Sequence, residues 1–402
     1  MKTRLLLCLA ALLVGCSTSK EKTPPEPTAS RLLPEGWDAK AAGDQVMAGL
    51  FKVTGPAVKG AHDAHFAIVG DRAYVVAEVN ERQAGESADW PFVYATLSIV
   101  DLRNDCLLDV MTMARSEQAF ANETLPVGTC FVPRIKQVGP KTLRCWFASE
   151  QPGKRQSQTY YRDFDLGTLT FEREIHRMKL RTSEGLFDLQ PQTLHADAAK
   201  QGFQRQPVDA GLYLFDNFKE FDGRTYIAIN NYLGAQQALC TLNAAADTLE
   251  VVGHFNGPGE HALTEPAVNR LPDGSWLAIC RKESGDPNYW FCESRDGKTW
   301  TTGGPKSFVV GGAASKPTFD KFNGTYYLGW QERTRIDKVG RSVFNIDISK
   351  DGLTWERKYR FETAKSFQYP TFVESNGAVW LAVTQGDSDP SRKERIMFGR
   401  LE

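Results

Sequence analysis

The sequence lacks an excess of charge of either sign, because 48 Lys and Arg stand against 49 Asp and Glu among its 402 residues. Binding to nucleic acid normally requires a clear basic surplus, so we expect no nucleic-acid partner. Beyond the N-terminal segment, no apolar run approaches the roughly 18 residues of a membrane-spanning helix. With 41% hydrophobic and 24% charged residues, the composition also excludes a disordered, collagen-like or coiled-coil chain. A folded globular protein remains.

The N-terminal segment has the pattern of a signal peptide. Residues 1–4 are basic, and residues 5–14 form an apolar run that as a helix would extend roughly 15 Å, half of a hydrocarbon core of about 30 Å. The run ends in Leu13-Val14-Gly15-Cys16, which resembles the bacterial lipobox. This resemblance implies that residues 1–15 are a lipoprotein signal peptide and that Cys16 receives lipid.

Residues 16–44 are predicted to be the lipidated cysteine and a flexible tether, because their first half is polar and rich in proline and cannot form a core. A lipid anchor places the protein in the cell envelope, attached to membrane lipid. A serine after the modified cysteine, here Ser17, resembles the pattern of lipoproteins that are sent to the outer membrane. The pattern does not distinguish the periplasmic face of that membrane from the surface face.

The remaining cysteines allow two interpretations. In an oxidising compartment the six that follow Cys16 could form up to three disulfides, and Cys130 with Cys145 or Cys280 with Cys292 could meet across a hairpin. They could equally be buried thiols that pack as small hydrophobic groups. None has the spacing of a zinc site, so we expect no metal and no cofactor, although a structural Ca²⁺ is not readable from the sequence.

The body of the chain contains six copies of one hairpin. Three clear copies begin at Glu265, Lys316 and Tyr369, each followed by proline, with starts 51 and 53 residues apart. Weaker copies cover residues 63–77, 132–147 and 215–228. Such spacing is typical of propeller blades, each of which buries its faces against its neighbours. We therefore predict an all-β, six-bladed β-propeller over residues 45–402, with an insertion around 152–210 on a loop face where it would shape a binding site. The alternative is a β-sandwich.

Two turns carry a family resemblance. Residues 294–300, Ser-Arg-Asp-Gly-Lys-Thr-Trp, and residues 349–355, Ser-Lys-Asp-Gly-Leu-Thr-Trp, resemble the Asp-box (BNR repeat) of sialidase-like propellers. In such a turn the Ser and Asp side chains bond backbone amides, the glycine takes a left-handed conformation and the tryptophan packs into the blade. The turn indicates the fold more than the activity, because non-catalytic propellers of this family carry it too.

The residues that begin the six copies should meet at the axis of the ring, because the innermost strand of each blade lines the central cavity. They are Asp63, Val132, Phe215, Glu265, Lys316 and Tyr369. Two carboxylates, a lysine and a tyrosine around one point have the composition of a functional site.

The resemblance to sialidases, which covers residues 263–401, implies roles for several residues. Tyr369 would be the nucleophile, and Glu265 would be the base that takes its proton. Arg281 and Arg341 would belong to an arginine cluster that grips the substrate carboxylate, for which a planar fork of donors is suited. We add Asp63 as the candidate proton donor to the leaving group, which would require burial to keep it protonated.

The chain also departs from the family pattern. No Phe-Arg-Ile-Pro, the usual carrier of the first arginine, occurs near the start of the propeller. The similar segment Phe-Val-Pro-Arg-Ile on the second blade makes Arg134 a further candidate for binding substrate. Lys316 is not part of the sialidase set but is expected to contact substrate at the axis. The histidines His62 and His65 could supply a base or hold a metal, or could be ordinary solvated or capping residues.

These residues predict a retaining glycoside hydrolase that resembles exo-α-sialidases and acts on terminal acidic sugars. A neutral phenol suits such a sugar, because the carboxylate next to the reacting carbon would repel an anionic nucleophile. The alternatives are another propeller glycosidase, a polysaccharide lyase that uses His62 or His65 with Tyr369, or a non-catalytic glycan-binding lipoprotein. In each case we expect a glycan or polysaccharide partner and a monomer.

Overall fold

The computed structural model describes residues 31–85, 90–151, 157–256, 262–285, 288–387 and 393–402. The predicted signal peptide, the lipid site Cys16 and the first half of the tether lie outside these ranges. Neither helix in the described part of the chain is long and apolar enough to cross a membrane.

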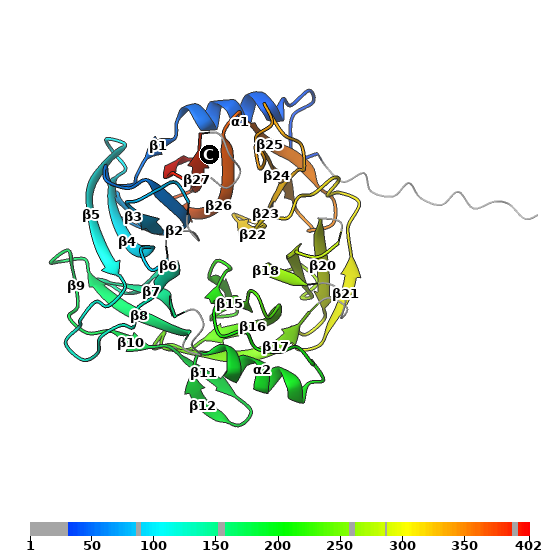
Figure 1. Cartoon of the computed structure of the whole chain (residues 1–402). Helices are drawn as coiled ribbons and strands as arrows, with labels where there is room; N and C mark the ends of the chain where they lie inside the picture. Colours follow the sequence, from blue (N-terminus) through cyan, green and yellow to red (C-terminus); the bar gives the residue numbers. More distant parts are fainter. Residues whose placement is uncertain (1–30, 86–89, 152–156, 257–261, 286–287, 388–392) are drawn as a thin grey trace, which may run out of the picture.

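The described strands form six sheets arranged as a ring around a central axis, which is the predicted six-bladed propeller (Figure 1). Blade 1 contains β2 (Gly60–Val69), β3 (Arg72–Asn80), β4 (Tyr94–Asp101) and β5 (Cys106–Ala114). Blade 2 contains β6 (Thr129–Gly139), β7 (Thr142–Glu150), β8 (Gln158–Asp165), β9 (Thr170–Phe171) and β10 (His176–Arg177). Blade 4 contains β18 (Leu263–Arg270), β19 (Trp276–Lys282), β20 (Tyr289–Ser294) and β21 (Trp300–Gly304).

Blade 5 follows the same simple order, whereas blades 3 and 6 include strands from elsewhere in the chain. Blade 3 contains β13 (Leu212–Leu214), β14 (Lys219–Phe221), β15 (Arg224–Asn231), β16 (Gln236–Leu242), β17 (Thr248–Phe255), β11 (Lys179–Thr182) and β12 (Gly185–Asp188). Blade 5 contains β22 (Thr318–Phe322), β23 (Thr325–Gln331), β24 (Val343–Ser349) and β25 (Glu356–Glu362). Blade 6 contains β26 (Ser366–Ser375), β27 (Ala378–Gly386), β28 (Arg395–Arg400) and β1 (Phe51–Lys52). Because β1 pairs with β28, the start of the folded region closes the ring beside its end.

Hydrophobic side chains fill the space between neighbouring blades. Val76 and Leu97 of blade 1, for example, pack in one buried cluster with Ile135 and Phe147 of blade 2. Each such side chain contributes about 1.5–3 kcal/mol when it is removed from water. The six cysteines of the described residues are free thiols, of which only Cys106 is exposed, so the buried-thiol interpretation describes the other five.

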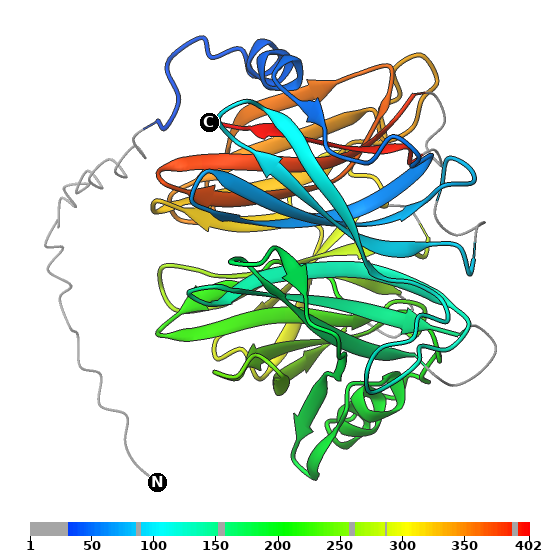
Figure 2. The same ribbon diagram turned by 90° about the vertical axis from the view of Figure 1, so that its left-hand side faces the viewer.

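From residue 157 on, the described part of the insertion lies on the outside of the ring and not at the central cavity, which corrects our expectation for these residues. Its β11 pairs in parallel with β17 at the outer edge of blade 3 and continues into the hairpin with β12. The helix α2 (Pro191–Lys200) follows on the same side, as Figures 1 and 2 show. None of the described residues between 157 and 210 lines the central cavity.

Part of the predicted tether is folded. The helix α1 (Ala39–Ala48) begins after Asp38, whose carboxylate accepts hydrogen bonds from two backbone amides of its first turn. It packs across β25 on the rim of the ring (Figure 2). Gly43 permits this close approach, because a Cβ atom there would lie 2.2 Å from the carbonyl oxygen of Arg360. The folded region therefore begins before residue 45, the predicted start.

The two Ser-x-Asp-Gly turns have the predicted geometry. Asp296 Oδ1 accepts the amides of Lys298 and Thr299 at 2.8 and 2.9 Å, and Gly297 has a φ of 74°. The Trp300 indole donates to the Gly297 carbonyl at 2.8 Å. The turn at 349–355 repeats these contacts in blade 5. Both turns join the two outermost strands of their blades, away from the axis.

Candidate active site

The innermost strands break their pairing where they face the axis. The register shifts in β2, β6, β18 and β26, and the bulged residues Asp63, Val132, Glu265 and Tyr369 all have a φ between 44° and 50°. Three of these four residues precede proline, which has no N–H group and so leaves no donor unpaired in the bulge. The bulge directs one side chain of each strand out of the regular alternation and toward the axis.

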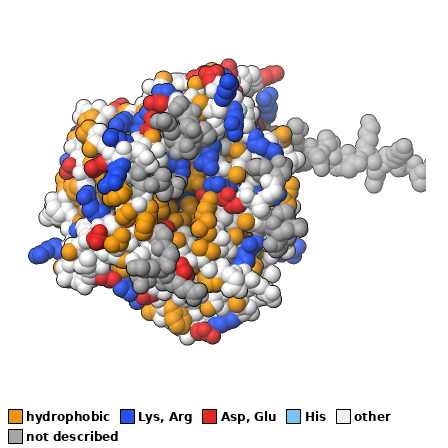
Figure 3. Space-filling view, viewed as in Figure 1, with side chains coloured by type: hydrophobic (Ala, Val, Ile, Leu, Met, Phe, Trp, Pro, Cys, Tyr) orange, Lys and Arg blue, Asp and Glu red, His pale blue; other side chains and the backbone are white. Residues whose placement is uncertain are grey.

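A cavity of about 280 Å³, which we call the axial cavity, opens at this point. Figure 3 shows hydrophobic and basic side chains gathered around a hollow near the centre of one face. Five of the six residues predicted to meet at the axis line the cavity, and the sixth, Lys316, bonds to Asp63. The described lining residues are His62, Asp63, Glu78, Phe131, Val132, Tyr213, Phe215, Tyr232, Glu265, Arg281, Arg341, Tyr369 and Lys393.

Three residues from two blades contact one another in the cavity wall. The Tyr369 hydroxyl donates a hydrogen bond to Glu265 Oε1. Arg281 Nη1 lies 3.0 Å from Glu265 Oε1 and 3.0 Å from Tyr369 Oη. Burial opposes the charge on Arg281, but Glu265, Tyr369 and Glu283 outweigh it and raise the arginine pKa well above its usual value. A phenolate at Tyr369 would therefore form beside a permanent cation.

Cationic groups occupy one side of the cavity. Arg341 lies on this side with its guanidinium carbon 6.0 Å from the centre of the Tyr369 ring. The guanidinium group of Arg341 is oriented by two hydrogen bonds. Nη1 donates to Gln368 Oε1 at 2.7 Å, and Nη2 donates to the Ala314 carbonyl oxygen at 3.2 Å. Lys393 also lines the cavity, so the cationic side presents three groups in all.

Asp63 lies at the axis as predicted, but its environment contradicts the predicted role as proton donor. Its Oδ2 is 3.2 Å from both Nη1 and Nη2 of Arg134, and its Oδ1 is 2.7 Å from Lys316 Nζ. Burial alone would favour the neutral acid, but the two cations outweigh burial and lower the Asp63 pKa to about 2. The carboxylate is therefore ionised near neutral pH and has no proton to give.

Arg134 and Lys316 do not reach the described cavity wall, which corrects their assignment as substrate-binding residues. Arg134 is completely buried and also donates to the carbonyls of Pro133 and Phe215. Lys316 is buried beneath the cavity with Nζ 5.5 Å from the centre of the Tyr369 ring. The two side chains hold Asp63 in place and join blades 1, 2 and 5.

The two histidines have different positions. His62 lines the cavity, its Nδ1 is 3.0 Å from Thr384 Oγ1, and its ring centre lies 4.2 Å from that of Tyr369. His65 is buried behind the wall, where burial and then Arg134 lower its pKa well below its usual value. Among the described residues, no group of three or more His, Cys, Asp and Glu side chains is arranged to hold a metal ion.

Among the lining residues that do not begin a hairpin, the sequence analysis named Arg281, Arg341 and His62 but missed Glu78, Lys393 and three aromatic residues. Glu78 and Arg281 lie on the second strands, at positions paired with His62 and Thr264 next to the bulges. Glu78 could have been found by asking which residue of the second strand pairs with His62, the residue before the bulge. The three aromatic residues are Phe131 and Tyr213, whose ring centres lie 6.4 Å apart, and Tyr232, whose ring centre lies 5.8 Å from the guanidinium carbon of Arg281.

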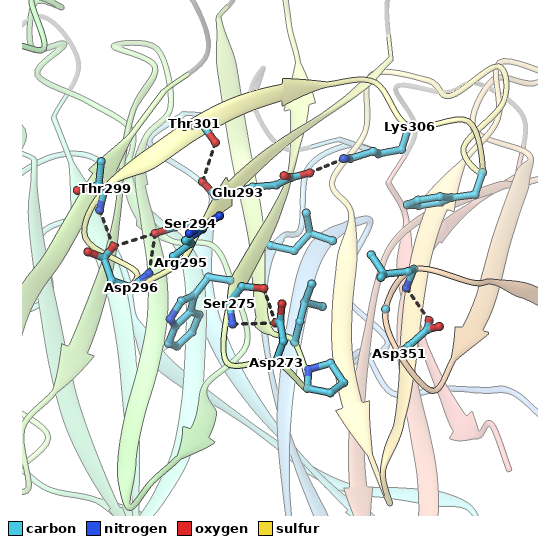
Figure 4. Close-up of a pocket in the computed structure, with 17 residues that line it drawn as sticks. Asp273, Ser275, Glu293, Ser294, Arg295, Asp296, Thr299, Thr301, Lys306 and Asp351 are labelled. Atoms are coloured by element: carbon cyan, nitrogen blue, oxygen red, sulfur yellow. Dashed lines mark hydrogen bonds and ion pairs between the residues drawn. The ribbon is translucent and has the colours of Figure 1, made fainter. Parts of the chain in front are cut away.

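A larger groove of about 970 Å³ lies on the outside of the ring between blades 4 and 5. Figure 4 shows that its carboxylates bond within their own turns or to a neighbour, as Asp296 does to Thr299 and Glu293 to Lys306. Asp351 and Asp273 likewise bond to their own turns. These groups stabilise the turns and do not converge on a common point, so the axial cavity is the better candidate despite its smaller size.

Comparison of this chain with known proteins finds similarity in fold alone. No protein-family model matches the sequence, and no curated protein matches it. A solved protein of unknown function from Dyadobacter fermentans superposes with a TM-score of 0.59 at 12% identity, over 88% of this chain and 98% of that one.

Solved sialidases share the same fold. Trypanosoma rangeli sialidase in complex with sialic acid has a TM-score of 0.52 at 11% identity, and the Hadza microbial sialidase Hz136 has 0.54 at 13%. The matches cover 88% and 89% of this chain, but only 57% and 66% of those chains. This chain therefore spans little more than half of the trypanosomal sialidase, and the likeness establishes a sialidase-like propeller fold.

Proposed function

We propose that the protein is a glycoside hydrolase that removes terminal acidic sugars from glycans in the manner of an exo-α-sialidase. The observation that carries this proposal is the contact among Tyr369, Glu265 and Arg281. A hydroxyl bonded to a buried carboxylate is an activated nucleophile, and sialidases are the exception among glycosidases in using tyrosine. The shared fold of solved sialidases supports the same reaction class.

The proposed reaction has two displacements. Tyr369 Oη attacks the anomeric carbon while Glu265 accepts the phenolic proton, and a covalent glycosyl-enzyme forms. Water then attacks the same carbon, and Tyr369 departs and recovers its proton. Two inversions at one carbon retain its configuration. Arg281 Nη1, 3.0 Å from Tyr369 Oη, stabilises the charge that develops on this oxygen.

The cationic side suits an acidic sugar. Arg341 and Arg281 present planar forks that match a carboxylate, and Lys393 adds a third positive charge. Among the described residues, no hydrogen-bond partner reaches Oε2 of Glu265, although this atom is buried.

The test is hydrolysis of a fluorogenic aryl sialoside by the purified protein. Wild type should release the fluorophore, and Tyr369→Phe should abolish the release because the attacking oxygen is gone. Tyr160→Phe is the matched control, since the Tyr160 hydroxyl also donates to a glutamate, Glu123, at 2.9 Å but does not line the axial cavity. Unchanged turnover in Tyr369→Phe would remove this residue from the mechanism.

The result also separates the alternatives. A polysaccharide lyase remains a second candidate, because His62 lies against Tyr369 and could abstract a proton from a uronate. A lyase would create an unsaturated sugar with new ultraviolet absorbance, whereas a non-catalytic glycan-binding protein would bind without product. We further propose that lipid on Cys16 attaches the protein to the outer membrane, which incorporation of a labelled fatty acid into wild type but not Cys16→Ser would test.

A further inference from the structure

Glycoside hydrolysis also needs a proton for the oxygen of the departing sugar, and Asp63, the predicted donor, does not supply it. Asp63 is ionised between Arg134 and Lys316. In a displacement by Tyr369, the leaving group departs from the face of the carbon opposite the nucleophile. Any proton donor must therefore lie across the cavity from Tyr369.

A second tyrosine–glutamate pair lies across the ring. Tyr213 on β13 belongs to blade 3 and lines the axial cavity, whereas Tyr369 on β26 belongs to blade 6. Figure 1 shows these two blades on opposite sides of the axis. The Tyr213 side chain hydrogen-bonds to Glu150, the last residue of β7 in blade 2.

Glu150 has an environment unlike that of Asp63. Its side chain is buried, and the groups that act on its carboxylate are the Tyr213 hydroxyl and the backbone amide of Gly211 at 2.7 Å. Both groups are neutral. Burial dominates over these two hydrogen bonds and raises the Glu150 pKa to about 7. A large fraction of the molecules therefore carries a proton on this carboxyl near neutral pH.

We propose that Tyr213, supported by Glu150, donates the proton to the leaving-group oxygen. This proposal rests on the glycosidase function proposed above. Tyr213 is the catalytic residue of the pair, because it faces the cavity, and Glu150 acts through it as a positioning and proton-supplying residue.

The proton transfer balances without any other reactant. As the bond between the anomeric carbon and the glycosidic oxygen breaks, the Tyr213 O–H proton moves to that oxygen and the Glu150 proton moves to Tyr213 Oη. The departing sugar leaves as a neutral alcohol, and Glu150 is left ionised. When water attacks the glycosyl-enzyme, it gives a proton to Tyr213, and the Tyr213 proton returns to Glu150.

Tyr232, the other tyrosine near the cationic side, does not offer the same chemistry. Its hydrogen-bonded partner Glu283 forms an ion pair with Arg281 Nε at 2.7 Å. Glu283 is thus paired with a cation, whereas the groups that bond to Glu150 are neutral. Glu150 is therefore the better proton reservoir among the carboxylates that bond to cavity tyrosines.

The experiment compares two substrates in wild type and variants. An aryl sialoside has a leaving group that needs little protonation, whereas a sialyl-lactose has an alkyl leaving group that needs it fully. Tyr213→Phe should slow sialyl-lactose cleavage about 100-fold and aryl cleavage only a few-fold. Tyr160→Phe, which removes a hydroxyl from the other face of blade 2, should leave both rates unchanged.

Glu150→Gln gives a readout that a structural role would not move. In wild type, sialyl-lactose cleavage should fall as pH rises through about 7, because Glu150 loses its proton. The glutamine variant should be slow on sialyl-lactose and should lack this limb of the profile. Equal losses on both substrates in Tyr213→Phe, or an unchanged profile in Glu150→Gln, would overturn the proton transfer while leaving the hydrolase function in place. If wild type cleaves neither substrate, the hydrolase function itself fails and the proton transfer with it.

Discussion

Arg134 and Asp63 form an ion pair that has no access to water. Both Nη1 and Nη2 of Arg134 lie 3.2 Å from Asp63 Oδ2, and the two side chains are 0% and 1% exposed. Lys316 completes the cluster at 2.7 Å from Oδ1. Removal of one member of a buried cluster leaves the others uncompensated, which costs far more than loss of a surface pair.

Asp63→Asn should therefore destabilise the protein strongly. It leaves Arg134 and Lys316 buried beside each other without an anion, so we expect a loss of about 3–5 kcal/mol in the free energy of unfolding. Denaturant titration of the wild type and the variant measures this loss of free energy. Asp71→Asn is the control, because Asp71 pairs with Arg103 on the surface, where both side chains are more than half exposed. Equal stability of the two variants would show that the cluster does not hold the blades together.

The same cluster predicts an acid dependence of stability. The Asp63 pKa is about 2 in the folded protein and about 3.9 in an unfolded chain, so the folded state holds the ionised form more strongly. This contribution is fully present above about pH 4 and is lost as pH falls through about 2. Titrations at pH 5, 3 and 2 should show a fall of about 2–3 kcal/mol from this group in wild type that is missing in Asp63→Asn.

Glu265→Gln should lower kcat roughly 100-fold or more on a sialoside, because the amide cannot accept the phenolic proton of Tyr369. The contact with Arg281 changes from an ion pair to a hydrogen bond, so folding should survive. Steady-state kinetics with the aryl sialoside measures the effect. Glu123→Gln, which changes the partner of Tyr160, should keep the wild-type kcat. A Glu265→Gln enzyme with normal kcat would exclude Glu265 as the base.

Arg341→Lys should weaken recognition of the substrate carboxylate. Lysine keeps the positive charge but loses the two-pronged donor, and a charge-assisted hydrogen bond is worth about 1.5–3 kcal/mol. We expect kcat/KM for a sialoside to fall roughly 10–100-fold. Hydrolysis of the methyl ester of the same sialoside, which has no carboxylate, should change much less. Equal losses on acid and ester would mean that Arg341 does not bind the carboxylate.

The sequence allowed the ring and its axis to be predicted because both depend on repetition. Glu265 and Tyr369 occupy the same place in two repeats, each before a proline that suits a bulge, and so their meeting could be deduced. The environment of Asp63 could not be deduced in the same way. Its partner Lys316 is 253 residues away, and the repeats place both at the axis without telling which side chains neutralise each other and which stay open to substrate.

Tyr213 and Glu150 escaped sequence reasoning for a related reason. Tyr213 lies two residues before Phe215, on a short strand of the largest sheet, and Glu150 ends the second strand of another blade. Neither position repeats from blade to blade. The helix α1 was missed because the segment before it is polar and rich in proline, and its burial depends on one glycine that lets it approach β25.

Gly43→Ala tests that approach. The added Cβ atom would lie 2.2 Å from the Arg360 carbonyl oxygen, so helix α1 must move away from β25 or the strand must shift. Alanine favours the helix by up to about 1 kcal/mol, but the clash with backbone should outweigh this and cost about 1–3 kcal/mol net. Gly49→Ala is the control, because the nearest atom to its Cβ would be 3.5 Å away at Val46. Thermal unfolding should show a lower Tm for Gly43→Ala and little change for Gly49→Ala. If Gly43→Ala instead raises the Tm, helix propensity exceeds packing at this contact, and α1 does not depend on close contact with blade 5.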